Sequence, residues 1–594
     1  MNALIDFCAL HPGADSALRC AFDNPCQTLV AHTLDEVRPL LAQVEALSRQ
    51  GFWCVGYVRF EAAPAFDSAL EVYPADGPLA YFGVYENANP WPEATVTQAA
   101  QAQWQDSITR SRFDTQMRQI HHAISAGEIY QVNYTAPLSG TLQGKPLDLF
   151  LAMQRAQPQG YAACLDCGTE QVLSASPELF FDWNKDQLLV RPMKGTAPRG
   201  NDAQSDLEQA RKLQNSAKER AENVMIVDLI RNDLSRVAQP FSVRVPELFK
   251  VQTLPTVLQM VSDVQATSRK GTTLVDIFTA LFPCGSITGA PKVRAMKMIK
   301  SLENGPRGLY CGAIGVVRPG GHATFNVAIR TVTVQGKNLR CGIGSGITAD
   351  ATAADEWQEW RHKRAFLERA SATFQLLETL RLQDGQWHEE ALHLTRLARA
   401  SAHFGFIFEH TQVTHKLQTL ARTHAQGLWR VRLLLDRQGT SVLQASAQDT
   451  NPTQVTVQLA TRAFEAADSE FVRFKTTHRA HYEAMAPSTP GVFDTLLWNR
   501  QGEFTEFTRG NVAFLLDGRW ITPPLRCGLL DGVGRAHYLQ AQHLHEGVVT
   551  LQDLPRVQAM AFINSLRGWL SALWVPHDLY SATAATATLG VMQV

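Results

Sequence analysis

The stretch LLETLRLQDGQWHEEALHLTRLARASAHFGF, residues 376–406, starts a new pattern in a chain of 594 residues. It contains a strand, an Asp-Gly turn and an amphipathic helix. Before it, residues 350–380 are free of Pro and Gly and predict one long helix. A chain of this length exceeds what one hydrophobic core supports. The sequence therefore predicts two domains, residues 1–372 and 373–594, both of the α+β class with mixed or antiparallel sheets.

The composition is that of an ordinary globular protein and favours no charged partner. Apolar residues make up 45% and charged residues 19% of the chain, and 55 basic residues nearly balance 56 acidic ones. The first residues lack the pattern of a secretory signal, and no apolar run approaches the ~20 residues that span a bilayer. Ten cysteines show no disulfide or zinc spacing. We therefore expect a cytoplasmic protein with reduced thiols and with neither a membrane nor a nucleic-acid partner.

Two pairs of acids in the first half have the spacing of a helical metal site. Glu219 and Glu222 lie in KERAENVMIVDLIRNDLSRV, and Glu356 and Glu359 lie in ADEWQEWRHKRAF. A spacing of three places both carboxylates of a pair on one helix face. Two such faces could clamp Mg²⁺, which takes one or two protein carboxylates and binds an anionic substrate as well. Taken alone, such a pair is more often a solvated helix face.

Glycine-dense segments in the same half favour a bound anion. Glycines at this density let backbone N–H groups approach an anion closely. Tyr310, Arg330 and Lys363 would add side-chain donors suited to carboxylates. Together they indicate a dianionic small molecule without phosphate. The segments are PMKGTAPRG (192–200), FPCGSITGAPKVRAM (282–296), RGLYCGAIG (307–315) and CGIGSGITAD (341–350).

These segments, in this order, resemble the chorismate-utilising family, which includes anthranilate synthase, isochorismate and salicylate synthases, and aminodeoxychorismate synthase component I. The resemblance covers roughly residues 50–368. It implies a two-sheet α/β sandwich and chorismate as the substrate. It also implies that Glu222 and Glu359 hold Mg²⁺, with Glu219 and Glu356 beside them.

The resemblance implies further site residues. Glu178, in SASPELFF, matches the general acid that assists departure of the C4 hydroxyl group, a role that requires a raised pKa. Tyr310 and Arg330 are expected to bind the enolpyruvyl carboxylate. Lys363 and the backbone of Gly344, Ser345 and Gly346 are expected to lie at the ring carboxylate and around the metal. Thr288 is a further expected substrate-binding residue.

Two positions separate the members of this family. Isochorismate and salicylate synthases carry a lysine that activates water, and this chain has Gln131 at that position, in EIYQVNYT. Anthranilate synthases resemble P-x-A-G-T where this chain has PMKGT, with Lys194. In aminodeoxychorismate synthases this lysine attacks C2 of chorismate, and ammonia then opens the adduct at C4. Because an amine must be neutral to attack, we expect Lys194 to be desolvated or near another cation.

The second half contains weak signals for a phosphate-bearing cofactor. Lys475 lies in FVRFKTTHRAHYEAM, and a glycine-rich turn at 532–534 precedes an expected helix whose N-terminus could bind an anion together with Arg396. A lysine, an acid and an anion cradle are what a pyridoxal-phosphate enzyme needs. Each signal alone is more often a solvated lysine or a plain turn.

Together these signals resemble fold-type IV pyridoxal-phosphate enzymes, which include branched-chain and D-amino acid aminotransferases and aminodeoxychorismate lyase. The resemblance covers about 374–594. It implies that Lys475 carries the cofactor covalently, that Glu506 pairs with the pyridine nitrogen, and that Arg396 binds the phosphate with the Val533 and Gly534 backbone. The family turn usually reads G-I-T-R, so Gly534 replaces a threonine that could contact the phosphate.

The two resemblances predict one reaction sequence. Chorismate and ammonia would give 4-amino-4-deoxychorismate, and loss of pyruvate would then give 4-aminobenzoate. The choice of lyase over aminotransferase activity for the second half rests mainly on the fusion, because the first half would make the substrate of the lyase. The alternatives are an anthranilate synthase component joined to an aminotransferase, and a synthase joined to a non-catalytic module. No glutaminase region is visible, so ammonia would come from a separate glutamine amidotransferase subunit or from free ammonium. A homodimer through the second half is expected by analogy.

Overall fold

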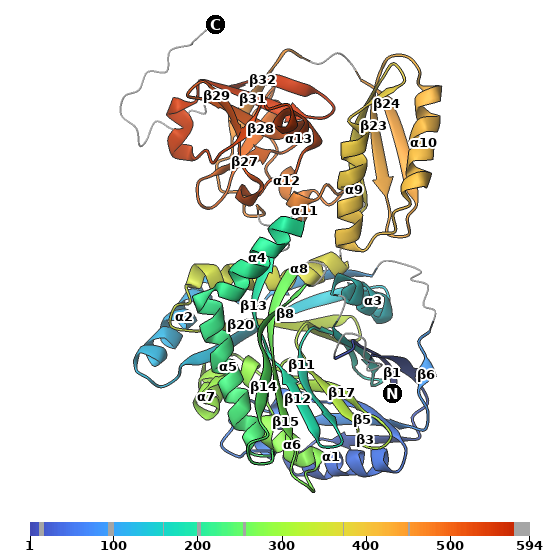
Figure 1. Ribbon diagram of the computed structural model, residues 1–594, viewed down its shortest axis with the longest axis vertical. Coiled ribbons are helices and arrows are strands. Elements are labelled where there is room, and N and C mark those ends of the chain that lie inside the picture. Colours follow the sequence, from blue (N-terminus) through green and yellow to red (C-terminus); the bar gives the residue numbers. More distant parts are fainter. Residues whose placement is uncertain are drawn as a thin grey trace. The chain divides into compact units, whose positions relative to one another are not determined.

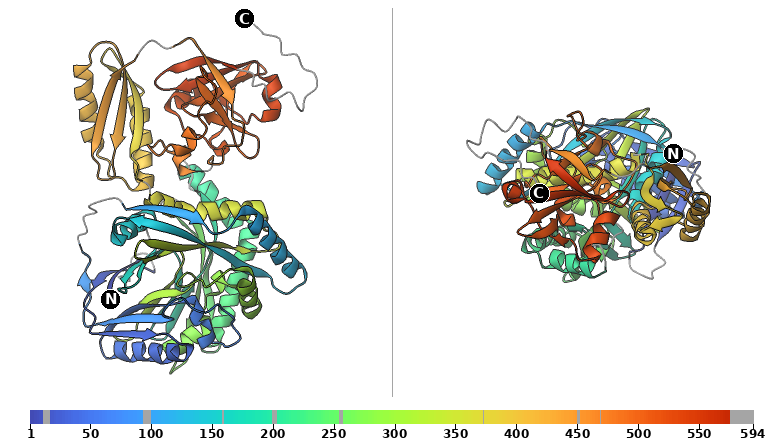
Figure 2. Two further views of the ribbon diagram at one scale, coloured as in Figure 1. Left: turned by 180° about the vertical axis from the view of Figure 1, so that it is seen from behind. Right: turned by 90° about the horizontal axis from the view of Figure 1, so that it is seen from above.

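The chain divides into two compact units, Met1–Ala372 and Thr373–Val594. We describe each unit by itself, and both are drawn in Figures 1 and 2. The computed structural model describes residues 1–10, 17–92, 100–157, 160–198, 203–253, 257–371, 373–448, 452–467 and 469–574.

Two antiparallel sheets of ten strands each form the described part of the first unit. The first sheet runs, in spatial order, β16 (Gly289–Ala290), β8 (Gln131–Gln143), β20 (Asn338–Ile347), β19 (Thr331–Gln335), β10 (Gln171–Ser176), β9 (Tyr161–Asp166), β1 (Asn2–Phe7), β2 (Leu18–Phe22) and β6 (Asn89–Pro90), with β7 (Gln101–Asp106) beside β8. The second runs β13 (Met193–Pro198), β15 (Val257–Thr267), β12 (Gln187–Arg191), β11 (Leu179–Asn184), β18 (Ala323–Val327), β17 (Ala313–Val317), β4 (Trp53–Val58), β5 (Ala80–Tyr85) and β3 (Gln27–Ala31), with β14 (Arg244–Thr253) beside β15.

The two sheets pack face to face through alternating apolar side chains. In β1 every second residue is buried, and Ile5 and Phe7 are almost fully covered. They belong to one cluster with Tyr57 of β4 and Ile314 of β17, which are strands of the other sheet. The two-sheet sandwich predicted for the first half is therefore confirmed.

Helices cover the sheets and carry the predicted acid pairs. The helices of the first unit are α1 (Leu34–Arg49), α2 (Arg110–Ser125), α3 (Pro146–Ala156), α4 (Ala203–Asn215), α5 (Ala217–Ser235), α6 (Leu274–Leu281), α7 (Lys292–Leu302) and α8 (Ala353–Ser371), with short 3-10 turns η1 (Phe60–Ala65) and η2 (Gly285–Ile287). Ser216 caps α5 by accepting a hydrogen bond from the Glu219 backbone N–H. In Figure 1, α5 lies beside β14 and β15 of the second sheet.

One expected helix is shorter than predicted. The stretch 350–380 does not form a single helix, because α8 ends at Ser371 and residues 376–380 belong to a strand. That strand, β21 (Leu376–Gln383), buries Leu376, Leu380 and Leu382 on one face and pairs with β23. Apolar residues at every second position indicate a strand here, and the absence of Pro and Gly does not by itself indicate a helix.

The second unit contains two further sheets. The smaller is antiparallel and runs β22 (Gln386–His388), β21, β23 (Leu428–Leu435) and β24 (Ser441–Ala447). The larger runs β27 (Phe504–Phe507), β26 (Asp494–Trp498), β25 (Gln454–Leu459), β32 (Gly568–Trp574), β31 (Ala559–Asn564), β28 (Asn511–Leu516), β29 (Arg519–Thr522) and β30 (His545–Glu546). The larger sheet is mixed, because β25 is parallel to both of its neighbours.

The helices of the second unit are short where the candidate site lies. In Figure 2 the two longer helices, α9 and α10, run alongside the smaller sheet. The full set is α9 (Glu390–Phe404), α10 (His410–Thr423), α11 (Glu470–Arg473), α12 (Ala480–Glu483) and α13 (Val533–Gln540), with 3-10 turns η3 (Leu525–Cys527) and η4 (Leu551–Arg556). Within the described ranges, no helix combines the length and apolar content that a bilayer crossing requires.

A buried ion pair joins two strands of the second sheet and provides a test of this fold. Arg191 donates to both carboxylate oxygens of Asp263, at 2.5 and 2.8 Å, and the Asp263 side chain is 2% exposed. Asp263→Ala leaves a buried guanidinium without its counter-charge, so we expect the free energy of unfolding to fall by about 3–5 kcal/mol. Urea unfolding followed by tryptophan fluorescence measures this. The double variant Arg191→Met/Asp263→Leu removes both charges and should recover most of the loss; a single variant as stable as the parent would contradict the pairing.

Candidate active sites

Lys194 lies where the edge of the second sheet meets the first. Its Nζ donates to Glu222 Oε2 at 3.1 Å, and each side chain is only 15% exposed. A Cβ atom on Gly346 of β20 would lie 2.8 Å from Lys194 Nζ and 2.6 Å from Gln131 Nε2. A side chain at position 346 would therefore displace the ends of both polar side chains from their present positions. Lys194, Glu222, Gln131 and Gly346 converge here, although they come from four different elements.

The four predicted glutamates lie around this lysine, each with its own surroundings. Burial raises the pKa of Glu219, and the negative charge of Glu222 adds to the rise. Burial likewise raises the pKa of Glu356, whose carboxylate accepts a 2.5 Å hydrogen bond from Ser345 Oγ. For Glu359 burial acts in the same direction, but the 2.7 Å ion pair with Lys363 outweighs it and lowers the pKa.

These carboxylates suit a cation that needs few protein ligands. Among the residues that the structure describes, no group of three or more His, Cys, Asp or Glu side chains is arranged to hold a metal ion. Glu219 nevertheless senses the charges of both Glu222 and Glu359, which come from α5 and α8. Mg²⁺ takes one or two protein carboxylates and completes its shell with water and substrate oxygens. Glu222 and Glu359 fit that donor set.

Glu178 is a buried carboxylic acid between β10 and β11. It is 4% exposed, and its Oε1 accepts a 2.7 Å hydrogen bond from Ser286 Oγ. Burial raises its pKa to about 7, although the Ser286 hydroxyl and the charge of Lys194 oppose the rise. An acid with this pKa can donate a proton near neutral pH.

The remaining predicted substrate residues each have contacts of their own. Lys363 Nζ donates to the Gly344 carbonyl at 3.0 Å, which fixes it beside β20. The Thr288 hydroxyl is engaged within its own turn, donating to the Cys284 carbonyl at 3.0 Å. Ser345 Oγ accepts from Trp360 Nε1 at 2.9 Å, on the side of α8.

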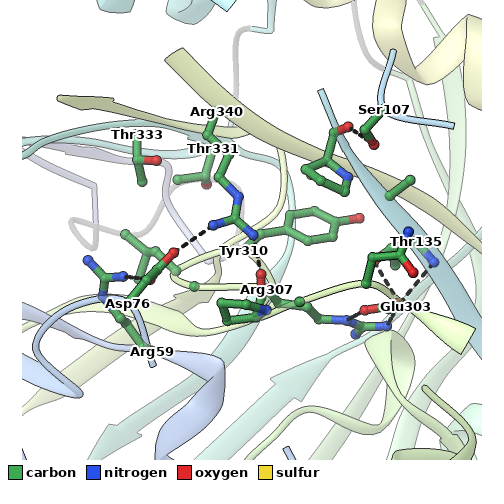
Figure 3. Close-up of a pocket in the computed structure, with 18 of the residues that line it drawn as sticks. Arg59, Asp76, Ser107, Thr135, Glu303, Arg307, Tyr310, Thr331, Thr333 and Arg340 are labelled. Carbon is green, nitrogen blue, oxygen red and sulfur yellow. Dashed lines mark hydrogen bonds and ion pairs between the residues drawn. The ribbon is translucent and has the colours of Figure 1, made fainter. Parts of the chain in front are cut away.

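Tyr310 and Arg330 face different surroundings. The Arg330 guanidinium lies 6.0 Å from the Phe366 ring centroid, and burial together with Arg369 lowers its pKa to about 10. Tyr310 lies against Gly342 and lines a cavity of about 440 Å³ (Figure 3). Of the predicted substrate residues within the described ranges, Tyr310 alone lines that cavity. That Tyr310 and Arg330 hold one substrate carboxylate stays a prediction.

In the second unit, Lys475 lies between the short helices α11 and α12. The Leu377 backbone N–H donates to its carbonyl at 3.0 Å and ties it to β21. The pKa of its amine is lowered to about 7, first by burial and then by the charges of Arg479 and Arg396, against the opposing effect of Glu378 and Glu506. A lysine with this pKa is partly neutral at pH 7 and can act as a nucleophile or base.

Glu506 is the buried acid opposite this lysine. It is 2% exposed, and burial raises its pKa to about 7. Tyr482 donates to Glu506 Oε1 at 2.5 Å, and Asn511 Nδ2 donates to Oε2 at 3.3 Å. Asn511 also donates to the Leu530 carbonyl at 2.9 Å, which links Glu506 to the turn before α13.

Arg396 lies at the same turn, so the predicted cofactor residues converge. Its Nη1 donates to the Asp531 carbonyl at 3.0 Å, just before α13 begins. Glu378 accepts from Arg396 Nε at 2.9 Å and Nη2 at 2.5 Å, and from His393 at 2.6 Å. Burial opposes ionisation of Glu378, but Arg396 and His393 lower its pKa to about 2. An anion at the helix N-terminus would meet a positioned guanidinium and free backbone N–H groups.

The glycine that replaces the usual threonine has a packing reason. A Cβ atom on Gly534 would lie 2.7 Å from the carbonyl carbon of Asn564 and 3.0 Å from the Ser565 nitrogen. These atoms belong to the backbone peptide between Asn564 and Ser565, which cannot move aside as a side chain could, so a threonine does not fit at this position without a shift of the backbone. The following Arg535 is 2% exposed and donates to the Pro523 carbonyl at 3.0 Å, so it is engaged on another side.

Sequence reasoning missed four residues that hold the second cluster in place. Tyr482 and Asn511 contact Glu506, Glu378 compensates Arg396, and Arg479 is the charge with the largest effect on Lys475. Arg479 also lies 4.5 Å above the Tyr482 ring. The buried position of Glu378 in an apolar strand was the one available signal, because a buried acid requires a partner.

The fold and the two clusters define a chain made of two enzyme domains. Residues 9–369 match the model of the chorismate binding enzyme family, and the chain belongs to this family. Residues 375–573 match the model of amino-transferase class IV. A class IV domain implies pyridoxal phosphate, and the donors around Lys475 fit that group. The predicted resemblance to both families is confirmed.

Several curated relatives match part of the first half. Aminodeoxychorismate synthase component 1 of Salmonella typhimurium is 43% identical over 256 residues, which cover 43% of this chain and 56% of the relative. The Escherichia coli protein of that name is 41% identical over 271 residues, covering 46% and 59%. Anthranilate synthase component 1 of Streptomyces coelicolor is 36% identical over 295 residues, covering 49% and 57%. The chain thus spans little more than half the length of these relatives.

A solved structure supports the fold of the first unit. Anthranilate synthase component I from Streptococcus pneumoniae aligns with a TM-score of 0.51 at 22% identity, covering 58% of this chain and 91% of that one. At this identity the likeness extends to the fold alone.

The raised pKa of Glu178 predicts the pH dependence of a reaction in which Glu178 acts as the acid. The carboxyl is protonated below about 7, so kcat/KM should fall as the pH rises through that value. Because the Ser286 hydrogen bond lowers this pKa, Ser286→Ala should move the falling limb to higher pH. Glu178→Gln should reduce kcat by roughly 10²–10⁴-fold. A pH profile of Ser286→Ala that moves in the other direction would contradict the assigned acid.

Arg479 should tune the amine of Lys475. Because its charge lowers the pKa of that amine, Arg479→Met should raise the pKa and slow labelling of Lys475 by an amine reagent at pH 7 by roughly three- to tenfold. Peptide mass spectrometry of the cofactor-free chain across a pH series measures this directly. Arg422→Met, at an exposed arginine of α10, is the matched control. Equal labelling rates in both variants would show that Arg479 has no such effect.

Proposed function

We propose that this chain converts chorismate and ammonia to 4-amino-4-deoxychorismate in its first unit and releases pyruvate from that intermediate in its second, giving 4-aminobenzoate. Matches to both families support the proposal, as do the relatives named aminodeoxychorismate synthase component 1. The observation that carries it is Lys194, a partly buried amine beside Glu222 and the Gly346 backbone.

In the proposed first reaction, the Lys194 amine forms a bond to C2 of chorismate and the C4 hydroxyl leaves. Glu178 supplies the proton, so the leaving group departs as water. Ammonia then bonds to C4 while the Lys194–C2 bond breaks, and the free amine is restored. Because Glu222 pairs with Lys194, the amine must lose a proton before it attacks, and that carboxylate or another base in the cluster would receive it.

Magnesium is part of this proposal. Glu222 and Glu359 would hold the ion, with Glu219 and Glu356 beside it, and its positive charge would help to bind the substrate carboxylate. When Lys194 and Lys363 release these two carboxylates, the oxygens become available for coordination. Lys363 would then remain beside the Gly344 carbonyl, facing the substrate.

In the proposed second reaction, pyridoxal phosphate, when bound, accepts the electrons released at the substrate carbon. Lys475 would carry the cofactor and move the proton. Glu506, held by Tyr482 and Asn511, would keep a proton at the pyridine nitrogen. Arg396 and the N-terminus of α13 at Val533 and Gly534 would hold the phosphate. The choice of a lyase rests on the first unit, which would make its substrate.

The ammonia source belongs to the proposal too. The relatives are named as component 1 of their enzymes, which supports a separate glutamine amidotransferase subunit as the donor, with free ammonium as the other source. We place the reaction in the cytoplasm. We also propose a homodimer through the second unit, on the analogy of the fold-type IV enzymes.

Product analysis of the full chain tests both halves. With chorismate, Mg²⁺, pyridoxal phosphate and ammonium, the parent chain should give 4-aminobenzoate and pyruvate. Lys475→Ala should stop at 4-amino-4-deoxychorismate and lose the cofactor absorbance near the visible edge. Lys194→Ala should form neither product while still binding chorismate. Lys212→Ala, at an exposed lysine of α4, is the matched control and should keep full activity.

Each rival has its own result in this experiment. Anthranilate (2-aminobenzoate) as the product would identify an anthranilate synthase joined to an aminotransferase, a reading supported by the 36% identical relative. No cofactor absorbance in the parent chain would identify the second unit as a non-catalytic module. Full activity in Lys194→Ala would exclude the covalent route.

A further inference from the structure

Arg307 is a buried arginine three residues before Tyr310. Its side chain is 3% exposed, and its guanidinium lies 4.7 Å from the Phe60 ring centroid. Glu303 accepts hydrogen bonds from Arg307 Nε at 3.0 Å and from Nη2 at 2.7 Å (Figure 3). The Thr135 hydroxyl of β8 also donates to Glu303, at 2.8 Å. Glu303 therefore compensates the buried charge of Arg307 and links it to β8.

The same guanidinium donates to two backbone carbonyls in other segments. Its Nη1 donates to the Ile287 carbonyl at 2.9 Å, and its Nη2 donates to the Asn133 carbonyl of β8 at 2.7 Å. Ile287 is the last residue of the 3-10 turn η2. The turn carries Ser286, which donates to Glu178, and Thr288 follows it. The backbone N–H of Asn133 donates to the Thr288 carbonyl at 2.7 Å. One planar, rigid side chain thus ties η2 to β8.

The backbone of Arg307 is held as well. Glu61 Oε1 accepts from the backbone N–H groups of Arg307 and Gly308, at 2.7 and 3.2 Å. Glu61 is 2% exposed and lies on the 3-10 turn η1. Because both the backbone and the guanidinium are fixed, the side chain sets the spacing of three segments: η2, β8 and residues 307–310. These segments carry, or directly precede, predicted site residues of the first unit: Thr288, Gln131 and Tyr310.

We propose that Arg307 is a positioning residue of the synthase site, which holds η2, β8 and the segment 307–310 in their relative places. It acts through other residues rather than on the substrate. Its effect on the acid passes through the Ile287 carbonyl to Ser286. Without a donor at that carbonyl, η2 shifts and the Ser286 hydroxyl leaves Glu178. The role in catalysis rests on the proposed function, whereas the hold on Glu178 does not.

Arg307→Lys tests this hold, because it keeps the positive charge and removes the planar fork. Infrared spectroscopy of the full chain, without added metal or substrate, follows the protonated carboxyl band that Glu178→Gln removes. The Ser286 hydrogen bond lowers the pKa of Glu178, so its loss in Ser286→Ala should raise the midpoint of the band by roughly 0.5–1 pH unit. Arg307→Lys should move the midpoint in the same direction. Both changes together should move it no further than Ser286→Ala alone, since they act on one hydrogen bond.

The other charges that act on Glu178 are the same in all of these variants. Lys194 and Lys363 lower the pKa of this carboxyl through their positive charges. The Cys284 thiol, just before η2, also lies near it, and burial raises the pKa of that thiol to about 12, so it stays neutral. A shift of the midpoint between variants therefore reports on the contact with Ser286.

Glu303→Gln is a second variant that leaves Arg307 in place and removes the charge that orients it. It should shift the midpoint in the same direction by a smaller amount. The matched control is Arg318→Lys, at a partly buried arginine that contacts His322 and Thr324 of the β17–β18 hairpin, and it should keep the parent's midpoint. An unshifted midpoint in Arg307→Lys, with circular dichroism like that of the parent, overturns the proposal. If Arg307→Lys does not fold, an unshifted midpoint in Glu303→Gln overturns it.

Synthase kinetics separate this proposal from the proposed function. With chorismate, Mg²⁺ and ammonium, Arg307→Lys should lower kcat/KM by roughly ten- to a hundredfold, mainly through a higher KM, because segments that bind the substrate lose their spacing. The falling limb of its pH profile should move with the infrared midpoint, and Arg318→Lys should keep the parent's rate. If the midpoint moves but the chain does not aminate chorismate, the positioning by Arg307 stands and the proposed function fails. If the midpoint stays while kcat/KM falls, the positioning fails and the proposed function stands.

Discussion

Burial removes water from three ionisable side chains, Glu178, Lys475 and Glu506. Their ordinary pKa values differ widely, but in this structure each pKa is about 7. Burial raises the pKa of the two acids and lowers that of the amine, because in each case it disfavours the charged form. All three groups can then exchange a proton near neutral pH. The same packing that covers the sheets therefore sets the chemistry in both units.

Desolvation of this kind is tolerated only because the charged neighbours are compensated. In the second unit Glu378 accepts two hydrogen bonds from Arg396, so the buried guanidinium, which we propose binds a phosphate, has its counter-charge beside it. In the first unit Glu222 and Glu359 pair with Lys194 and Lys363. The Glu378–Arg396 pair is almost fully buried, whereas the Lys363 and Glu359 side chains are 40% and 47% exposed. Under the proposed function, the pairs of the first unit would open to admit Mg²⁺ and substrate.

The sequence could predict those parts of the sites that follow from local spacing or from ordered motifs. The acid pairs of α5 and α8 were placed on their helices because a spacing of three fixes one face. The helix after Gly532 was expected from its glycine-rich turn and begins at Val533. The lack of Pro and Gly in segment 376–380 predicts a helix, whereas pairing with β23 makes the segment a strand.

Contacts between distant segments could not be predicted in this way. Asn511 reaches Glu506 and the turn at Leu530 at once, an arrangement set by the register of β27 and β28 in a mixed sheet. The resemblance implies that Tyr310 and Arg330 hold one carboxylate, but it does not give the packing of the Tyr310 ring against Gly342 of β20, which follows from contacts between distant segments.

Gln131 shows how a buried neutral group can restrict a reaction. Its side chain is fully buried, and neither amide atom has a hydrogen-bond partner among the described residues. It lies beside Gly346 and Lys194, where a nucleophile would approach. An amide cannot take a proton from water near neutral pH, so a water molecule held there would remain a weak nucleophile. Ammonia is the stronger nucleophile of the two and can attack before it loses a proton. A glutamine in place of a base at this position therefore agrees with the proposed amination rather than with hydration.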